Sequence, residues 1–204
     1  FVGMGTCGLA SGADKVKDAI IEELEKHQID AEIIPTGCIG YCAKEVIVDI
    51  KLPEQDRVSY SEITPKLVPK LIQKTLIEKD IFKEKLLGSH KKGNPKVEWI
   101  NDNPFFRRQL KIVLENCGIL DPESIDSYIA HGGFKGLDKA LRLMNPEGIV
   151  KEIIDSGLRG RGGGGFPTGK KWEFAFKQKS DVKYIVCNAD EGDPGAFMDR
   201  SVLE

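Results

Sequence analysis

The sequence contains 204 residues, which is enough for one large domain or two small ones. Its 30 basic and 32 acidic side chains nearly balance, so neither nucleic acid nor another polyanion is expected as a partner. No apolar run reaches the roughly 18 residues of a membrane span, and no signal-peptide pattern opens the chain. Together with the 30% of charged residues, these features predict a cytoplasmic protein.

The first part of the chain alternates short apolar runs with one clear amphipathic helix. Residues 1–7 are typical of a strand end that turns into a glycine-rich loop. Val16, Ile20 and Leu24 share one face of a helix predicted over 13–27. Further strands are predicted at 31–34 and 46–50, and a longer helix at 63–81. This order of strands, loops and helix is thioredoxin-like in outline.

The next stretch is polar, and residues 86–96 contain glycine and proline in a pattern typical of a linker. Apolar residues return at 103–117 as a helix or a strand, and Cys117 is expected to be an ordinary buried thiol. Three further helices are predicted, at 121–130, 136–144 and 146–156. We therefore expect one domain over 1–85, a linker over 86–117 and a second domain over 118–204.

Residues 157–172 form the most unusual stretch, with seven glycines among sixteen residues. Glycine lets backbone amides approach a ligand closely, and a run of glycines loses much conformational entropy on folding. Consecutive amides with nearby basic side chains are typical of a phosphate site. A flexible linker is the alternative, but Phe166, Pro167, Trp172 and Phe174 follow at once, and linkers seldom carry such residues.

Two standard phosphate-loop patterns fit this stretch only in part. Gly160, Gly162 and Gly165 satisfy the dinucleotide pattern, but a predicted helix precedes them where that fold requires a strand. Gly164 and Gly169 begin a P-loop pattern, but Lys171 stands where a Ser or Thr binds Mg²⁺. Neither pattern therefore explains the glycines.

A second group of polar residues follows a short apolar run at 184–187, which predicts a buried strand. Asn188, Asp190 and Glu191 would then lie at the carboxyl end of this strand, where α/β sheets bind ligands. A solvated turn rich in Asp, Gly and Pro is the alternative for the acidic residues. Cys187 is expected to be structural.

Together, residues 157–172 and 188–197 resemble the flavin-binding segment of the NADH-oxidising flavoprotein subunit of respiratory complex I. They resemble still more closely the beta subunit of NAD-linked, electron-bifurcating hydrogenases and formate dehydrogenases. The resemblance implies an α/β fold, in which a thioredoxin-like ferredoxin domain precedes the beginning of a complex-I-type FMN-binding domain. Family members continue for several hundred residues and carry a [4Fe–4S] domain, so we expect this sequence to be a fragment that is inactive by itself.

The resemblance also implies a role for each site residue. The FMN phosphate and the isoalloxazine edge would be held by Gly160, Arg161, Gly162, Gly163 and Lys171. The flavin and its ribityl chain would be bonded by Asn188, Asp190 and Glu191, and Glu191 is the residue assigned to catalysis. The incoming nicotinamide dinucleotide would stack on Phe166 and Phe174. Asp193 stands where the family has an acidic or small residue near the nucleotide.

Three cysteines near the N-terminus suggest metal or redox chemistry, because five cysteines are not an even disulfide set. Cys38 and Cys42 form a C-x₃-C pair, and Cys7 lies in an earlier glycine-rich loop. This resembles the family's [2Fe–2S] domain, whose four ligands come as C-x₄-C and C-x₃-C. The first cysteine is expected at position 2, where this chain has Val2. Three alternatives stay open: a cluster with one non-cysteine ligand, a docking domain that has lost its cluster, or a Cys38–Cys42 disulfide.

These features predict an FMN-containing subunit that exchanges hydride with NAD(H). It would pass electrons to iron–sulfur centres of its own and of partner subunits in a hydrogenase or formate dehydrogenase, with electron bifurcation among the implied reactions. A non-catalytic docking or assembly module is the alternative. A phosphate-loop nucleotidase is disfavoured by Lys171.

Overall fold

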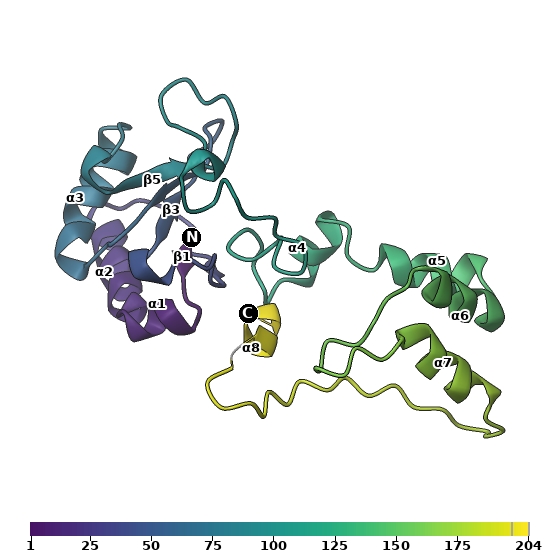
Figure 1. The fold of residues 1–204 in the computed structure, drawn as a ribbon. Helices are drawn as coiled ribbons and strands as arrows, with labels where there is room; N and C mark the ends of the chain where they lie inside the picture. Colours follow the sequence, from purple (N-terminus) through teal and green to yellow (C-terminus); the bar gives the residue numbers. More distant parts are fainter. Residues whose placement is uncertain (197, 204) are drawn as a thin grey trace. The chain divides into compact units, whose positions relative to one another are not determined.

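The structure, a computed structural model, describes residues 1–196 and 198–203. It divides into two compact units. We call Phe1–Ser127 with Ala189–Glu204 the N-terminal unit, and Tyr128–Asn188 the helical unit (Figure 1). Phe197, the last residue of the second flavin motif, and Glu204 lie outside the described residues.

A five-stranded mixed sheet organises the N-terminal unit. Its order is β2-β1-β3-β4-β5, with bounds Pro35–Thr36, Val2–Gly3, Val48–Ile50, Val58–Tyr60 and Leu86–Ser89. Strands β1 and β2 are parallel, whereas β3 runs antiparallel to both of its neighbours, β1 and β4. A parallel β1–β2 pair beside an antiparallel β3 is the arrangement of a thioredoxin-like sheet. The predicted fold class is therefore confirmed for this unit.

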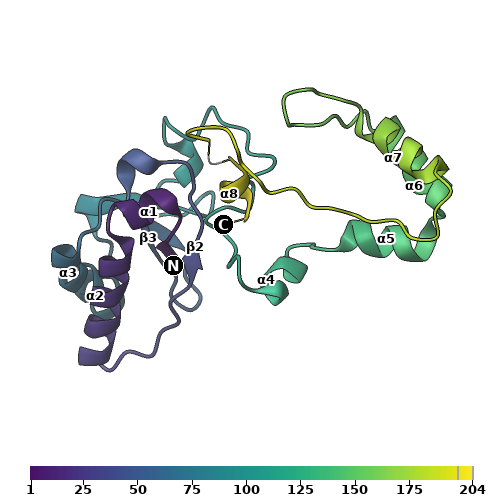
Figure 2. The same cartoon turned by 90° about the horizontal axis from the view of Figure 1, so that it is seen from below.

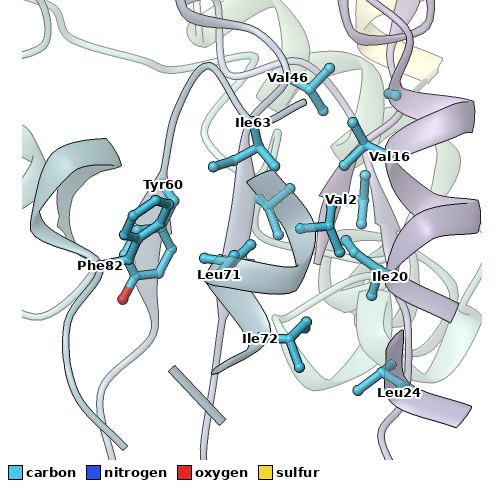
Figure 3. Packing of buried hydrophobic residues seen from close by; sticks show 13 residues of the cluster. Val2, Val16, Ile20, Leu24, Val46, Tyr60, Ile63, Leu71, Ile72 and Phe82 are labelled. Atoms are coloured by element: carbon cyan, nitrogen blue, oxygen red, sulfur yellow. The ribbon is translucent and has the colours of Figure 1, made fainter. Parts of the chain in front are cut away.

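Helices pack on this sheet through one apolar face each. Helix α2 (Ala13–Lys26) buries Val16, Ile20 and Leu24, as the helical spacing predicted. The second helical run joins three segments, η2 (Pro65–Leu67), α3 (Val68–Ile72) and η3 (Gln73–Ile77). Figure 3 shows Leu71 and Ile72 of α3 meeting the α2 side chains around Val2 of the sheet. This shared core fixes the loops that follow β1 and β2.

Several predicted elements of this unit differ in the structure. Cys7 lies in a short helix, α1 (Thr6–Ala10), rather than in a loop. The strand predicted at 31–34 is instead β2, because Pro35 and Thr36 are the residues that pair with β1. The linker predicted from residue 86 begins with β5, whose backbone pairs with β4. Gly88 permits the close approach of β5 to residue Ile100, since a Cβ there would lie 2.7 Å from Cα of Ile100.

The segment at 103–117 forms turns instead of the predicted helix or strand. The Asn103 side chain accepts a hydrogen bond from the amide of Phe105 at 2.9 Å, and such a local bond competes with regular structure. The remaining short elements of the unit are η1 (Cys42–Lys44), η4 (Lys83–Lys85), η5 (Ile100–Asp102) and α8 (Met198–Leu203).

Three helices make up most of the helical unit, and two of them, α5 (Lys135–Leu143) and α6 (Pro146–Asp155), were predicted. The third, α7 (Thr168–Lys177), was not predicted, whereas the predicted α4 (Ile125–Ala130) spans the boundary between the units. Asn145 caps α6 by accepting a hydrogen bond from the amide of Gly148 at 2.8 Å. Figures 1 and 2 show α6 and α7 side by side, with the loop that joins them projecting from their ends.

The strand predicted at 184–187 is wrong for the described residues. Tyr184, Ile185 and Val186 are 84%, 96% and 84% exposed, and Cys187 is exposed as well. A strand requires a neighbour that accepts and donates its backbone hydrogen bonds. Within the part of the chain that the structure describes, no strand pairs with this segment.

Candidate functional site

Cys7, Cys38 and Cys42 converge in the N-terminal unit. Their Sγ atoms all lie within 4.8 Å of one another, and Cys38 Sγ is 3.9 Å from Cys42 Sγ. All three cysteines are free, so the structure does not contain the Cys38–Cys42 disulfide that was one of the three alternatives. The structure thus brings together the three residues that the sequence suggested as metal ligands, and their role as ligands remains a prediction.

The sheet explains why residues so far apart in sequence meet. Cys7 and Cys38 follow β1 and β2, which are parallel, so their loops leave the sheet at the same edge. Cys42 returns to this edge as the first residue of η1. Gly40 has a φ of +89°, which turns the chain between the two cysteines, and its amide donates to Cys38 Sγ at 3.2 Å.

The surroundings of the Cys7 and Cys38 thiols raise the pKa of both groups in the metal-free state. Burial raises the pKa of Cys38 to about 12. A hydrogen bond with Cys42, followed by burial, raises the pKa of Cys7, and the nearby carboxylate of Glu45 contributes to both shifts. A bound cation reverses this preference, because a metal-coordinated thiol is deprotonated.

Position 2, where the fourth cysteine was expected, does not belong to this site. The side chain of Val2 is 1% exposed and packs among the core residues between the sheet and α2 (Figure 3). A side chain in β1 alternates between the two faces of the sheet, and this one faces the helices. Val2, which stands where the family's pattern has its first cysteine, therefore packs in the core and supplies no thiol to this site.

The glycine-rich loop of the helical unit is closed at its base. Arg159 and Pro167 form an antiparallel bridge, and the amide of Gly160 donates to the carbonyl of Phe166 at 2.8 Å. Arg159 reaches across the loop and donates from Nε to the carbonyl oxygen of Gly165 at 2.6 Å. The loop therefore has a defined hairpin base rather than the open form of a flexible linker.

Within this loop, the glycines divide into two kinds. Gly163 and Gly165 have φ values of +91° and +58°, which favour glycine. Gly162 and Gly164 do not have a positive φ, and a Cβ at either position would meet nothing within 4 Å. In the described part of the chain, the amides of residues 161–164 donate no hydrogen bond. Neither backbone conformation nor packing explains why positions 162 and 164 are glycines. The amides of Gly162 and Gly164 are available to bind a ligand.

Two basic side chains of the glycine-rich stretch and the start of α7 have no carboxylate partner among the described residues. Among the described residues, neither Arg161 nor Lys171 forms an ion pair. Lys170, by contrast, binds Glu173 at 2.9 Å. Hydrogen bonds from Lys177 and Lys170 lower the pKa of Glu173 to about 2. The two side chains predicted to bind phosphate, Arg161 and Lys171, therefore have no ion-pair partner among the described residues. The neighbouring Lys170 is paired with Glu173 within α7.

Phe166 and Phe174, predicted to stack on a nucleotide, are 53% and 55% exposed. They do not belong to the buried core of the described residues, although large aromatic side chains usually bury most of their surface. Their exposure leaves both rings free to contact a planar ligand. Gly160, Arg161, Gly162, Gly163 and Lys171 lie in the same helical unit as these two rings.

The polar residues of the second motif are divided between the two units. Asn188 ends the helical unit, whereas Asp190 and Glu191 belong to the N-terminal unit. The carboxylate of Glu191 accepts hydrogen bonds from the amides of Asp199 at 3.0 Å and Arg200 at 3.4 Å, which caps the first turn of α8. This capping role was missed, because Glu191 stands farther from α8 than the usual capping spacing.

Asp193 lies in a turn between Glu191 and α8. Its carbonyl oxygen accepts a hydrogen bond from the amide of Ala196 at 3.0 Å.

The sequence interpretation also missed a buried polar network in the sheet. Asp49 of β3 accepts a hydrogen bond from Nε of Arg57 at 2.7 Å, and its Oδ2 lies 3.4 Å from Nε2 of His90. Burial alone would raise the pKa of Asp49, but His90 and Arg57 together hold this pKa at about 2. A charged residue within the apolar run 46–50 was the available signal.

Comparison with known protein families finds a match near the C-terminal end of the sequence. Residues 153–204 match the family model described as the Nuo51 FMN-binding domain. This agrees with the predicted start of such a domain and confirms the resemblance for this region. Among the described residues, no helix combines the length and apolar character needed to cross a membrane.

Several curated relatives are similar over part of the chain. The NADP-reducing hydrogenase subunit HndC of Solidesulfovibrio fructosivorans is 60% identical over 98 residues, covering 48% of this chain and 20% of the relative. The F subunit of the NADH-quinone oxidoreductase of Aquifex aeolicus is 54% identical over 81 residues, 40% of this chain and 18% of that protein. The NAD-reducing hydrogenase HoxS subunit alpha of Cupriavidus necator is 54% identical over 67 residues, 33% and 11% of the two chains. The chain thus spans at most about a fifth of the length of these relatives.

Among solved structures, a thioredoxin-like [2Fe–2S] ferredoxin from Aquifex aeolicus is 22% identical, with a TM-score of 0.37. The similarity covers 42% of this chain and 77% of the ferredoxin. A likeness at this score does not identify the fold, which is defined here by the strand order of the sheet.

Proposed function

We propose that this protein is an FMN-containing electron-transfer subunit of a cytoplasmic, multisubunit oxidoreductase. It exchanges hydride with NAD(H) and passes the electrons to iron–sulfur centres of the complex. The similarity of residues 153–204 to the Nuo51 FMN-binding domain supports FMN as the cofactor. The relatives that match are subunits of NAD(P)-linked hydrogenases and of NADH-quinone oxidoreductases, which supports the class of complex.

The observation that carries this proposal is the pair of glycines at 162 and 164. Both have room for a side chain within the described chain, and neither has a positive φ. Their occurrence is explained if a ligand lies against the backbone, because a Cβ would then hold the ligand away from the amides. Neighbouring amides of this kind form a concavity that suits a phosphate group. The residues present therefore fit the phosphate end of FMN.

The surrounding side chains neutralise the phosphate, stack on the dinucleotide and form hydrogen bonds with the flavin. Arg161 and Lys171 neutralise the phosphate, and Phe166 and Phe174 offer exposed ring faces to the nicotinamide dinucleotide. Asn188 and Asp190 supply hydrogen bonds to the flavin and its ribityl chain. FMN, when bound, accepts a hydride from NADH and releases the electrons one at a time.

Glu191 tunes this reaction through its negative charge, which lies at the first turn of α8. No side chain of the protein has to donate or remove a proton for hydride to move between the two cofactors.

The partner we propose is a hydrogenase or a formate dehydrogenase, and electron bifurcation is among the reactions that such a complex would support. Two of the three relatives described above are named as hydrogenase subunits, which favours the hydrogenase. The preference for NAD(H) follows the names of the HoxS and quinone-oxidoreductase relatives, whereas HndC is named for NADP.

The test compares glycine-to-valine variants of the purified full-length protein. Gly162→Val and Gly164→Val should each lose most of the bound FMN, measured by flavin fluorescence after acid release, and the bleaching of flavin absorbance by NADH. Gly136→Val is the matched control, because a Cβ at this exposed helix position also meets nothing within 4 Å. Full flavin content in all three variants would contradict the placement of FMN at this loop. Absence of flavin from the wild-type protein would instead favour the docking-module alternative.

A further inference from the structure

The three converging thiols of the N-terminal unit form a metal site whose occupant can be inferred from their geometry. Among the described residues, Cys7, Cys38 and Cys42 make up the one group of three or more metal-ligating side chains within 4.8 Å of one another. They come from three separate elements, α1, the loop after β2, and η1. Chance proximity along one helix therefore does not explain the cluster.

A two-iron cluster does not fit this arrangement. In a [2Fe–2S] cluster with four cysteines, the thiolates come in two pairs, one pair on each iron. Here three thiols converge, and the position at which the family's pattern has its first cysteine is the buried core residue Val2. The site therefore has three of the four cysteine ligands that such a cluster needs.

We propose that Cys7, Cys38 and Cys42 instead bind a single tetrahedral, thiophilic metal ion of the Zn²⁺ class. A Zn–S bond of about 2.3 Å in tetrahedral geometry places two sulfur atoms roughly 3.8 Å apart. The separation of Cys38 Sγ and Cys42 Sγ is already 3.9 Å. Small side-chain adjustments bring the third thiol to the same spacing.

The surroundings of the thiols suit a bound cation with thiolate ligands. The amide of Gly40 donates to Cys38 Sγ at 3.2 Å, the kind of bond that stabilises a coordinated thiolate. The ammonium group of Lys111 donates to the carbonyl of Ile39 at 2.8 Å and balances the negative charge of three thiolates. Cys42 is exposed, so the fourth coordination position is reached from solvent and is filled by water.

This ion would link the loops at one edge of the sheet and carries no electrons, because Zn²⁺ has no redox chemistry. Electrons from the flavin would then leave through iron–sulfur centres elsewhere in the complex. Metal binding by the N-terminal unit is independent of FMN binding by the glycine-rich loop. An experiment can therefore contradict the metal site without contradicting the FMN site, and the reverse.

The first experiment measures zinc, iron and acid-labile sulfide in the full-length protein and in a Cys38→Ser variant. We expect the variant to lose about one zinc per chain, with iron and sulfide unchanged, as for a single tetrahedral site. Cys117→Ser is the matched control, since Cys117 is also partly buried and free but lies outside the group. Loss of about two irons and two sulfides with Cys38→Ser would overturn the proposal in favour of a two-iron cluster.

A second measurement avoids dependence on a variant that fails to fold. Chelator-treated wild-type protein is titrated with Co²⁺ alone, and its visible spectrum is recorded. We expect the intense bands of tetrahedral Co²⁺ and a thiolate-to-cobalt charge-transfer band, saturating at about one ion per chain and abolished by added Zn²⁺. A spectrum without thiolate charge transfer would show that the three cysteines do not bind such an ion.

Discussion

Arg57 donates a hydrogen bond from Nε to Oδ2 of Asp49 at 2.7 Å, and both side chains are nearly buried. The same guanidinium group donates to the carbonyl oxygens of Gly118 and Ile119. Arg57 therefore joins the centre of the sheet to the end of the irregular segment at 103–117, part of which lies beside the cysteine site through the bond from Lys111 to Ile39. The Arg57–Asp49 pair thus links strand β3 to residues Gly118 and Ile119, which no helix or strand among the described residues connects to it.

Replacement of Arg57 should strongly destabilise the N-terminal unit. Arg57→Ala leaves the Asp49 carboxylate buried without its guanidinium partner, which costs about 3–5 kcal/mol of unfolding free energy. Urea unfolding followed by circular dichroism measures this loss. Lys44→Ala is the control, because the ion pair of Lys44 with Glu62 is exposed and contributes only about 0–1 kcal/mol. Similar losses in the two variants would show that burial of the Arg57–Asp49 pair does not matter.

The same carboxylate should make the stability of this unit depend on acid pH. Folding lowers the pKa of Asp49 from about 3.9 to about 2, because His90 and Arg57 outweigh the effect of burial. The resulting stabilisation is fully present above the unfolded pKa and is lost as the pH falls through the folded pKa. Linkage gives a loss of roughly 2–3 kcal/mol between about pH 5 and pH 2.

Urea midpoints measured across this pH range test the prediction. In Asp49→Asn, the dependence on pH should become shallower, since the titrating group is absent. Glu173→Gln should leave the profile unchanged, although hydrogen bonds from Lys177 and Lys170 also lower the pKa of Glu173 to about 2, because this carboxylate is exposed to solvent. A profile for Asp49→Asn that matches the wild type would assign the acid sensitivity to other carboxylates.

A glycine within α7 should be essential for helix packing, in contrast to a glycine on the surface of α5. A Cβ at Gly169 would lie 2.6 Å from Cα of Ile154 in α6, and backbone atoms cannot move aside as a flexible side chain can. Gly169→Ala should therefore destabilise the packing of α6 against α7 by about 1–3 kcal/mol. Gly136→Ala, with open space around its Cβ, should stabilise α5 by up to about 1 kcal/mol.

Hydrogen exchange distinguishes these two outcomes residue by residue. Amides of α6 and α7 should exchange faster in Gly169→Ala, and amides of α5 should exchange more slowly in Gly136→Ala. Unchanged protection of α6 in the first variant would mean that the packing of α6 against α7 accommodates a Cβ at position 169, and would contradict this prediction.

The sequence predicted those parts of the fold in which local pattern and burial agree. The helical spacing of Val16, Ile20 and Leu24 identified both α2 and the face that it buries. The run at 184–187 has equally clear β-branched character, yet it forms no strand among the described residues, because a strand depends on a partner that propensity does not supply. Strand β5 escaped detection because its last residues, Gly88 and Ser89, resemble a linker unless their contacts with β4 and Ile100 are known.

The candidate sites were likewise predicted where a local sequence pattern was enough, and missed where distant residues make contact. The spacing of Cys38 and Cys42 suggested a metal site, and the parallel pair β1–β2 explains why Cys7 joins them. That position 2 faces the core depends on the pleat of β1, which the sequence spacing of cysteines does not reveal. The capping of α8 by Glu191 is likewise a contact between residues that no local pattern links.

Two adjacent lysines offer a sharp test of the phosphate site. Lys170 is bound to Glu173 at 2.9 Å, whereas Lys171 forms no ion pair among the described residues. If Lys171 contributes its charge to the FMN phosphate, Lys171→Ala should weaken FMN binding by about ten- to a hundredfold, as expected for a hydrogen bond to a charged group. Lys170→Ala removes the same charge from the same turn of α7 and should change FMN affinity much less, because its charge is already balanced by Glu173. Flavin fluorescence titration of the flavin-free full-length protein measures both affinities. Equal weakening would indicate a general electrostatic effect of the helix and would remove Lys171 from the phosphate site.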